Sequence, residues 1–188
     1  MTNLWRSIRV TLVMAVLLGL VYPLFILLIG NLAFPFQAAG SMIKFQGHVV
    51  GSELIAQQVN TSGLFHPRPS AVQYAGNGSG GSNLGPTNPA LIQEIRNNER
   101  ALNVLPGTKL SSIPTDMVES SASGLDPDIS IADAMLQVPR IAQTTGLSQS
   151  VLGSLVRRYE TGRFLGIWGE PMVNVMTLNV AIKELMKK

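Results

Sequence analysis

The chain contains no cysteine and only two histidines, His48 and His66, among its 188 residues. Without cysteine there is no disulfide, no thiol nucleophile and no cysteine metal site, so an exported domain would depend on packing alone. No carboxylate accompanies the two widely separated histidines at ligand spacing. We therefore expect no metal site in this chain.

Charged residues are also scarce, at 13% of the chain. The net charge is +3, and Arg6 and Arg9 supply two of these charges. The sequence pI near 9.5 therefore does not reflect a basic surface. Because no stripe of Lys or Arg is present, we expect no nucleic-acid partner.

The clearest feature that is present is one long uncharged segment, residues 10–30. It runs from Val10 to Gly30 without a charged residue. As a helix it would extend about 31 Å, and the hydrocarbon core of a bilayer is about 30 Å thick. The run is longer than the apolar part of a signal peptide, and only a poor cleavage site follows it. We therefore predict a retained transmembrane helix.

Three residues within this span bear on its neighbours. Pro23 lies near the middle and removes a backbone donor, so we expect a kink there. Ala15 and Gly19 lie four residues apart, a spacing that lets a second helix approach closely. We expect the span to contact membrane lipid and either to carry an ordinary kink or to pack against partner helices.

The flanking charges predict the orientation of the span. Arg6 and Arg9 precede it, and no charge follows until Lys44. Positive residues stay on the cytoplasmic side of a membrane. We therefore expect a single-pass protein of the cell membrane, with a cytoplasmic N-terminus (1–9), a transmembrane helix (10–30) and an extracytoplasmic domain (31–188).

The segment after the span predicts an α+β domain with a small sheet and several helices. Short strands are expected on both sides of a turn at Gln46-Gly47. Four polar residues stand where helix N-caps are expected, before amphipathic runs; they are Asn88, Ser130, Ser148 and Asn174. Ser130 and Asp133 form a capping-box pattern with Asp in place of Glu. Met135 and Tyr159 are among the side chains expected to point inward.

Two polar loops, residues 62–90 and 120–130, interrupt these elements. The first contains six glycines and four prolines, which exclude a long helix or strand. It also contains Phe65, Tyr74 and Leu84, which can anchor it to a core. We therefore expect an ordered loop and not a flexible linker.

Two patterns in these loops resemble catalytic or nucleotide-binding motifs. The glycines at 76–81 fit a dinucleotide fingerprint, but no strong strand precedes them and prolines follow. Ser70, His66 and either Asp126 or Asp128 could form a triad, although no nucleophile elbow is present. A membrane-tethered periplasmic hydrolase therefore stays open as an alternative function, as does a tethered solute-binding module.

Arg68 stands between two prolines and is the only formal charge between Glu53 and Glu94. Its guanidinium offers five donors, which suit either buried carbonyls or a partner carboxylate. We favour the structural role, because a turn-rich loop needs internal donors. For Asp126 and Asp128 we expect turn and capping roles.

Five loop motifs together resemble the small C subunits of Kdp potassium-transporting ATPases. They are HPRPSA at 66–71, SGGSNLGPTN at 79–88, SGLDPDIS at 123–130, QVPRIA at 137–142 and GEPMVNVMTLNVA at 169–181. The single span and the PFQAAGSMI segment after it also match. The resemblance therefore covers essentially the whole chain.

This resemblance implies a non-catalytic accessory subunit of a high-affinity, ATP-driven potassium uptake complex. In that complex a channel-like subunit selects potassium and a P-type ATPase subunit hydrolyses ATP. ATP and potassium would thus be handled by the complex, and we expect no cofactor on this chain. The C subunit would stabilise assembly and, as a catalytic chaperone, raise the ATP affinity of the pump subunit. Because ATP is cytoplasmic, that effect would be a coupling between distant sites.

Seven polar residues within these motifs are candidates for partner contacts or for structuring the loops. They are Arg68, Ser70, Ser82, Asn83, Asp126, Asn174 and Asn179. We assign no catalytic residue. The span from Val10 to Gly30, with Pro23, is the candidate surface for contacts between helices in the membrane.

Overall fold

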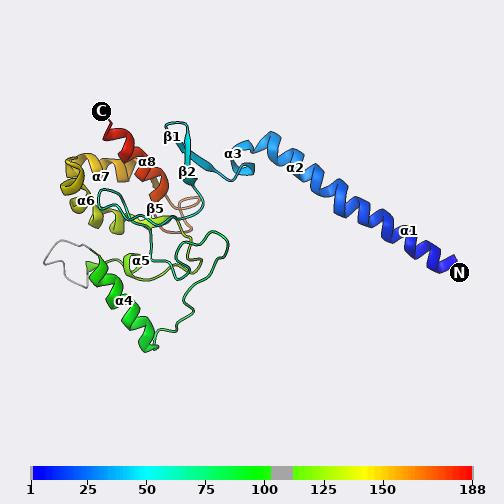
Figure 1. Cartoon of the computed structure of the whole chain (residues 1–188), viewed down its shortest axis with the longest axis horizontal. Helices are drawn as coiled ribbons and strands as arrows, with labels where there is room; N and C mark the ends of the chain where they lie inside the picture. The colour runs from blue at the N-terminus through cyan, green and yellow to red at the C-terminus, as the bar shows by residue number, and fades with distance from the viewer. Residues whose placement is uncertain (1, 103–111, 188) are drawn as a thin grey trace. The chain divides into compact units, whose positions relative to one another are not determined.

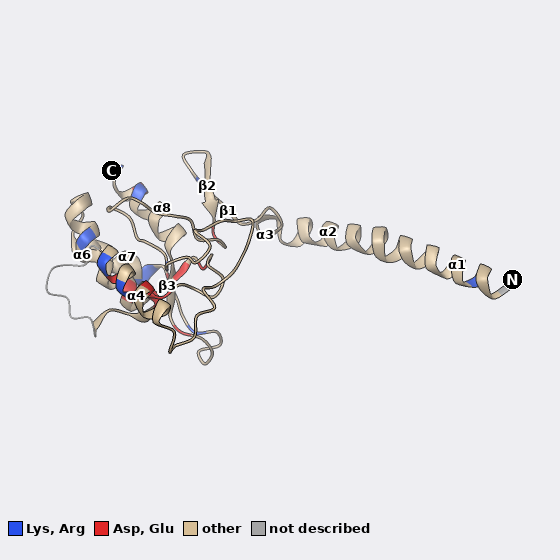
Figure 2. Cartoon of the chain, turned by 60° about the horizontal axis from the view of Figure 1, so that its bottom comes forward, with Lys and Arg blue, Asp and Glu red and all other residues tan. Residues whose placement is uncertain are grey.

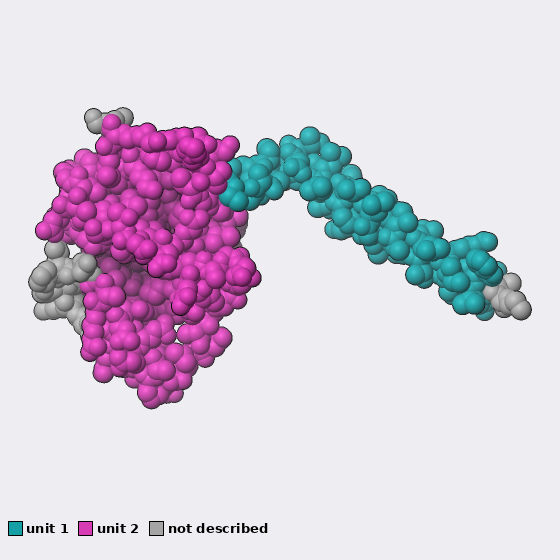
Figure 3. All heavy atoms as spheres, in the orientation of Figure 1, with its two compact units in different colours: residues 1–42 teal, residues 43–188 magenta. Residues whose placement is uncertain are grey.

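The structure is a computed structural model that describes residues 2–102 and 112–187. It contains two compact units, Met1–Met42 and Ile43–Lys188, which Figure 3 distinguishes by colour. The first unit is helical, and the second combines strands and helices. The predicted α+β class, with one apolar N-terminal helix, is confirmed.

The first unit consists mainly of one continuous run of helix. It comprises α1 (Thr2–Val16), the π-helical segment η1 (Leu17–Val21) and α2 (Tyr22–Ala33) (Figure 1). Within the described residues, Asn3–Ala33 is the one helix long and apolar enough to cross a membrane. Figure 2 shows α2 without a charged residue. The short helix α3 (Pro35–Ala38) follows.

The π-helical segment η1 shows how the helix accommodates Pro23. A proline ring collides with the carbonyl four residues back, which here belongs to Gly19. The amide N–H of Tyr22 donates to the oxygen of Leu17, five residues back. The helix therefore makes one wide turn directly before the proline and then continues.

Two strands, β1 (Met42–Phe45) and β2 (His48–Ser52), form a two-stranded sheet. Gln46 and Gly47 join them, with φ angles of 55° and 80°. Positive φ at both central residues is the conformation of a type I′ turn, whose twist matches that of the flanking strands. The predicted strands and turn are confirmed.

A second sheet, with three strands among the described residues, organises the rest of this unit. Its antiparallel order is β3 (Asp128–Ser130), β5 (Met172–Asn174) and β4 (Glu160–Thr161). Two strands lead directly into helices, since α6 (Ile131–Thr145) follows β3 and α8 (Val175–Leu185) follows β5. The helix α7 (Gln149–Arg158) lies between α6 and β4 in sequence, and Figure 1 shows α6, α7 and α8 grouped near β5.

The hydrophobic core lies between this sheet and helices α6, α7 and α8. Fully buried side chains come from each of them: Ile129, Val173, Val138, Ile141, Leu152, Val156, Leu178 and Ile182. Phe65, from the glycine- and proline-rich loop, is buried in the same cluster. The loop is therefore part of the core, as its apolar anchors predict.

All four predicted N-caps are confirmed. Asn88, Ser130, Ser148 and Asn174 each accept a backbone N–H from the first turn of the following helix. Asn88 opens α4 (Pro89–Ala101). A further short helix, α5 (Thr115–Val118), follows Pro114.

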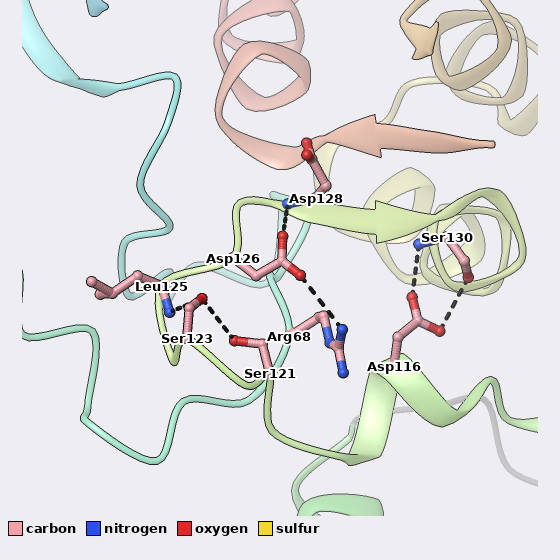
Figure 4. Close-up of polar contacts among 8 residues, drawn as sticks. All are labelled: Arg68, Asp116, Ser121, Ser123, Leu125, Asp126, Asp128 and Ser130. Atoms are coloured by element: carbon pink, nitrogen blue, oxygen red, sulfur yellow. Dashed lines mark hydrogen bonds and ion pairs between the residues drawn. The ribbon is translucent and has the colours of Figure 1, made fainter. Parts of the chain in front are cut away.

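The capping box predicted at Ser130 is half correct. The Ser130 hydroxyl accepts the Asp133 amide at 3.0 Å. The Ser130 amide donates to Asp116 at 2.7 Å and not to the Asp133 carboxylate (Figure 4). Asp133 is buried on the inner face of α6, so a carboxylate from α5 takes over the second contact.

Two side chains predicted to point inward are exposed, Met135 on α6 and Tyr159 directly after α7. Helix α6 buries Ala134, Val138 and Ile141 in the core. Met135 lies outside this buried face. On α7 the buried position near the end of the helix is Val156. The predictions for Val138 and Leu152 are confirmed, since both side chains are buried in the core.

The two polar loops pack against one another through backbone hydrogen bonds. The amide of Gly80 donates to Ser123 O at 2.8 Å, and that of Ser121 donates to Pro69 O at 3.2 Å. Gly124 lies at this contact with φ of 66°, and a Cβ there would come within 2.6 Å of the Val72 side chain and 2.7 Å of Gly80 O. Only glycine fits this position without displacing the opposite loop.

We predict that Gly124→Ala destabilises the protein more than Gly146→Ala. Both glycines have positive φ, so both variants incur backbone strain of roughly 1–2 kcal/mol. A Cβ at Gly146 meets nothing within 4 Å, whereas one at Gly124 clashes with the other loop. The clash should lower the free energy of unfolding by roughly a further 1–3 kcal/mol. Denaturant unfolding of the full chain in detergent measures both variants, and equal losses would contradict the loop contact.

Candidate functional site

Asn179 on α8 holds the backbone of the loop at Phe65. Its Oδ1 accepts the Phe65 amide and its Nδ2 donates to the Phe65 carbonyl, both at 2.8 Å. Neighbouring antiparallel strands exchange the same pair of bonds. A buried side-chain amide thus stands in for a strand, and this candidate residue structures the loop.

Gln137 on α6 does the same for the next residue, His66. Its Oε1 accepts the His66 amide at 2.8 Å, and its Nε2 donates to the His66 carbonyl at 3.0 Å. The same Nε2 also donates to Oδ1 of Asp133 at 2.8 Å. Gln137 and Asn179 therefore fix two consecutive loop residues from two different helices.

Arg140, one turn further along α6, binds the carbonyls that precede these residues. Its Nη1 donates to Ser62 O, and its Nη2 donates to Leu64 O at 3.0 Å and to Gln137 Oε1 at 2.7 Å. This is the carbonyl-binding role that we expected of Arg68. Gln137 and Arg140 stand in the motif QVPRIA, but we did not single them out.

A signal for these two residues was present in the sequence. Asp133, Gln137 and Arg140 are spaced four and three residues apart, so they line one face of a helix. A polar stripe beside the apolar residues of an inward-facing helix indicates buried polar partners. The sequence does not say that those partners are loop carbonyls and amides.

Arg68 has an internal carboxylate partner in place of the expected carbonyls. Its Nη1 lies 3.4 Å from Oδ2 of Asp126, and both side chains are partly exposed (Figure 4). Its Nε is buried and has no partner among the described residues. The Arg68 carbonyl accepts a hydrogen bond from the Tyr74 hydroxyl at 2.8 Å. The proline-flanked segment is thus fixed by its neighbours.

The side chains proposed for a triad are engaged elsewhere. The Ser70 hydroxyl donates to Gly124 O at 2.6 Å and accepts the Tyr74 amide at 2.9 Å. His66 Nε2 lies 3.2 Å from Thr61 O. Asp126 pairs with Arg68. This geometry gives the hydrolase alternative no support.

Asp126, Asp128 and Asn174 form a connected set of turn and capping contacts. Oδ1 of Asp126 accepts the Asp128 amide at 3.1 Å. Nδ2 of Asn174 donates to Asp128 Oδ1 at 3.1 Å and to Glu53 O at 2.8 Å, while its Oδ1 caps α8. Asn174 thereby connects three distant segments of the chain at one point.

Ser82 and Asn83 differ from the other five candidates. Within the described ranges, neither side chain makes a hydrogen bond to the rest of the chain. Asn83 is exposed and has φ of 55°, a conformation that asparagine tolerates better than most residues. These two polar side chains therefore remain available to a partner.

Asp133 is the buried carboxylate of the polar stripe on α6, which consists of Asp133, Gln137 and Arg140. Burial raises the pKa of Asp133 to about 7, which the hydrogen bond from Gln137 partly offsets. Its Oδ1 is hydrogen-bonded, but its buried Oδ2 has no partner among the described residues. Burial, and then the charge of Arg140, lower the pKa of His66. A cavity of about 110 Å³ lies beside these side chains.

The described residues contain no group of three or more His, Asp or Glu side chains able to hold a metal ion. Most candidate residues contact loop backbone or one another. The arrangement fixes the shape of two irregular loops on a small core.

Comparison with known proteins gives one consistent family. The family described as "KdpC: K+-transporting ATPase, c chain" matches residues 4–184. A "Potassium-transporting ATPase KdpC subunit" from Caldanaerobacter subterraneus subsp. tengcongensis is 50% identical over 184 residues, covering 97% of this chain and 95% of the relative. The protein of the same description from Paraburkholderia phytofirmans is 47% identical over 190 residues, with 98% of each chain covered. That from Synechocystis sp. is 44% identical over 190 residues, with 96% and 97% covered.

We predict that Arg140→Met lowers the free energy of unfolding by about 1–3 kcal/mol, because the partly buried Leu64 carbonyl loses its donor and Gln137 Oε1 loses one of its two. The matched variant Arg68→Met loses one partly exposed ion pair and should cost less than about 1 kcal/mol. Both are measured by denaturant unfolding of the full chain in detergent. A loss at Arg68 as large as that at Arg140 would reverse the roles assigned to the two arginines.

We also predict that Asp133 makes the protein less stable as the pH rises. The pKa of Asp133 in the folded protein, about 7, lies above its ordinary value of 3.8. The folded state therefore keeps the proton between these values while the unfolded state loses it. Stability from this group is complete below about pH 4 and is lost as the pH rises through 7.

The variant Asp133→Asn tests this linkage, because asparagine keeps a neutral side chain at every pH. The melting temperature of the wild type should fall relative to that of the variant between pH 4.5 and pH 8, by several degrees. Taking this difference removes the opposite contribution of His66, whose folded pKa is lowered. Parallel melting curves for the two proteins across this pH range would show that Asp133 is ionised in the folded state.

Proposed function

The chain belongs to the KdpC family of potassium-transporting ATPase subunits, and we propose that it is the accessory C subunit of an ATP-driven potassium uptake complex. The observation that carries this proposal is the family match over residues 4–184, which includes the apolar helix and the domain together. The relatives from Caldanaerobacter and Paraburkholderia phytofirmans are covered almost end to end.

In this proposal the chain crosses the cell membrane once. Residues 1–9 are cytoplasmic, residues 10–30 span the bilayer, and residues 31–188 are extracytoplasmic. Two observations support it. The helix Asn3–Ala33 is long and apolar enough to span, and Arg6 and Arg9 lie before the uncharged run.

The partners would be a channel-like subunit that selects potassium and a P-type subunit that hydrolyses ATP. The span would pack against their helices through the face that carries Ala15 and Gly19, next to the wide turn η1. The outer domain would cover the external mouth of the channel-like subunit. Ser82 and Asn83 are the proposed contact residues, because the other candidates have partners within this chain.

The chain would act as a catalytic chaperone by raising the ATP affinity of the pump subunit. ATP is cytoplasmic, and the domain is proposed to lie outside, so the effect would be a coupling between distant sites. Such coupling requires a domain that transmits displacement without deforming. Asn179 fixes the backbone of Phe65, Gln137 fixes that of His66, and backbone hydrogen bonds join the two polar loops. These contacts keep the domain rigid.

We predict that a complex purified without this chain has a KM for ATP about 5–150-fold higher, the usual range of such coupling, with kcat nearly unchanged at saturating ATP. Reconstitution of the wild-type chain should restore the KM. Steady-state ATPase assays over a range of ATP concentrations measure both.

The control in this experiment is a chain in which residues 10–30 are replaced by an unrelated apolar helix. It should enter the membrane but be retained poorly by the partner subunits and fail to restore the KM. An unchanged KM in the complex that lacks the chain would contradict the chaperone role. Full restoration by the control would mean that the outer domain alone carries the association.

A further inference from the structure

The connection between β4 and β5 exposes four large apolar side chains at one point of the surface. Their exposed fractions are 71% for Phe164, 72% for Leu165, 67% for Ile167 and 60% for Trp168. The rings of Phe164 and Trp168 lie 6.5 Å apart and pack on one another at 38°. We call residues 164–168 the apolar tip. None of its four large side chains belongs to the core of the domain.

Four of the five backbone amides of the apolar tip donate to backbone carbonyls of residues 163–168. Phe164 and Trp168 pair as a bridge, and the Phe164 amide donates to Trp168 O at 2.8 Å. The amides of Ile167 and Trp168 both donate to Phe164 O at 3.1 Å, and that of Gly166 donates to Arg163 O at 3.0 Å. Leu165 and Gly166 make the turn, with φ of 51° and 74°.

Hydrogen bonds within the segment itself are what a backbone needs in an apolar environment. Where water is absent, an unpaired backbone N–H or C=O is strongly unfavourable, so inserted segments must bond to themselves. A sheet edge that docks a protein strand does the opposite, since it offers unpaired donors and acceptors. The apolar tip therefore suits lipid better than it suits strand addition by a protein.

The residues beside the apolar tip are those found where membranes meet water. The six residues from Phe164 to Gly169 carry no charge, and Arg163 and Glu170 flank them as an exposed ion pair at 3.6 Å. Arg157 and Arg158 stand exposed in the last turn of α7. Tryptophan concentrates at the level of the headgroups, and arginine beside an apolar segment attracts anionic lipid.

The chain length keeps the start of the second unit close to any bilayer that the N-terminal helix spans. The second unit begins at Ile43, ten residues after the apolar helix ends at Ala33. Ten fully extended residues span at most about 35 Å. A domain on so short a tether meets the membrane surface at a high effective concentration, so a small apolar tip is enough for lasting contact.

We propose that the apolar tip inserts into the headgroup region of the membrane that the N-terminal helix spans, and so attaches the domain at a second point. Phe164, Leu165, Ile167 and Trp168 enter the boundary between headgroups and acyl chains, and Arg157, Arg158 and Arg163 face anionic headgroups. The occupant is lipid, and a pocket of a partner subunit is the competing occupant. This attachment does not depend on the identity of the partner subunits.

The two tryptophans of the chain, Trp5 and Trp168, make a direct test possible. The variant Trp5→Phe leaves Trp168 as the single tryptophan of the full chain. It is reconstituted alone into vesicles of phosphatidylcholine and phosphatidylglycerol, with brominated lipid as a quencher in the bilayer and iodide as a quencher in water on both sides. The sister variant Trp168→Phe leaves Trp5, at the start of the apolar helix, to calibrate both quenchers.

We expect Trp168 emission to be blue-shifted, quenched by brominated lipid and severalfold less sensitive to iodide than free tryptophan. Adding Leu165→Asp and Ile167→Asp should shift the emission to the red and expose Trp168 to iodide. The melting temperature in detergent should stay unchanged, because neither side chain packs on the core. This last measurement separates loss of insertion from loss of fold.

Two results would overturn the proposal. Water-like emission with full access to iodide in these vesicles would show that the apolar tip stays in solution. Access to iodide in the chain alone, followed by protection from both quenchers after reconstitution with the pump subunits, would assign the apolar tip to a protein pocket instead of lipid.

Discussion

The structure of the second unit depends on buried loop backbone that has no strand beside it. Phe65 lies in the core, so its amide and carbonyl are shielded from water, and those of His66 are partly buried. Each such group left unpaired would be destabilising by about 1–3 kcal/mol. The side-chain amides of Asn179 and Gln137 pair all four groups. A glycine- and proline-rich loop can therefore enter the core without being a strand.

The rest of the domain follows from this pairing. Asn179 and Gln137 stand on α8 and α6, so holding the loop also fixes these helices relative to each other. The held loop in turn supports the second polar loop through Ser70 and Gly124. The polar stripe on α6 has one unfavourable member, since Asp133 is buried with one oxygen unpaired among the described residues. Its raised pKa reflects that burial.

This arrangement explains what most of the motif residues do. Five of the seven candidates make contacts inside the chain, and Arg140 and Gln137 of the QVPRIA motif hold the loop backbone. These motif contacts define the shape of the two loops. The surfaces left for contacts outside the chain are the polar pair Ser82 and Asn83, the apolar helix, and the apolar tip.

The sequence alone determined the features whose causes are local. The uncharged run predicted the apolar helix, four polar residues predicted the helix starts, and Gln46-Gly47 predicted the turn. Hydropathy, capping and turn geometry act within a few residues, so they can be read along the chain. The five loop motifs indicated the family for the same reason, since their order is linear.

The tertiary structure alone decided which side chains hold the loops. Asn179 and Phe65 are 114 positions apart, and Gln137 and His66 are 71 apart. Because Arg68 stands between two prolines in a turn-rich loop, we expected it to donate to loop carbonyls. In the structure Arg140 donates to them, and Arg68 pairs with Asp126. The difference depends on the rotation of α6 about its axis and on where the loop crosses it. Both are set by packing of the whole core, which no short stretch of sequence encodes.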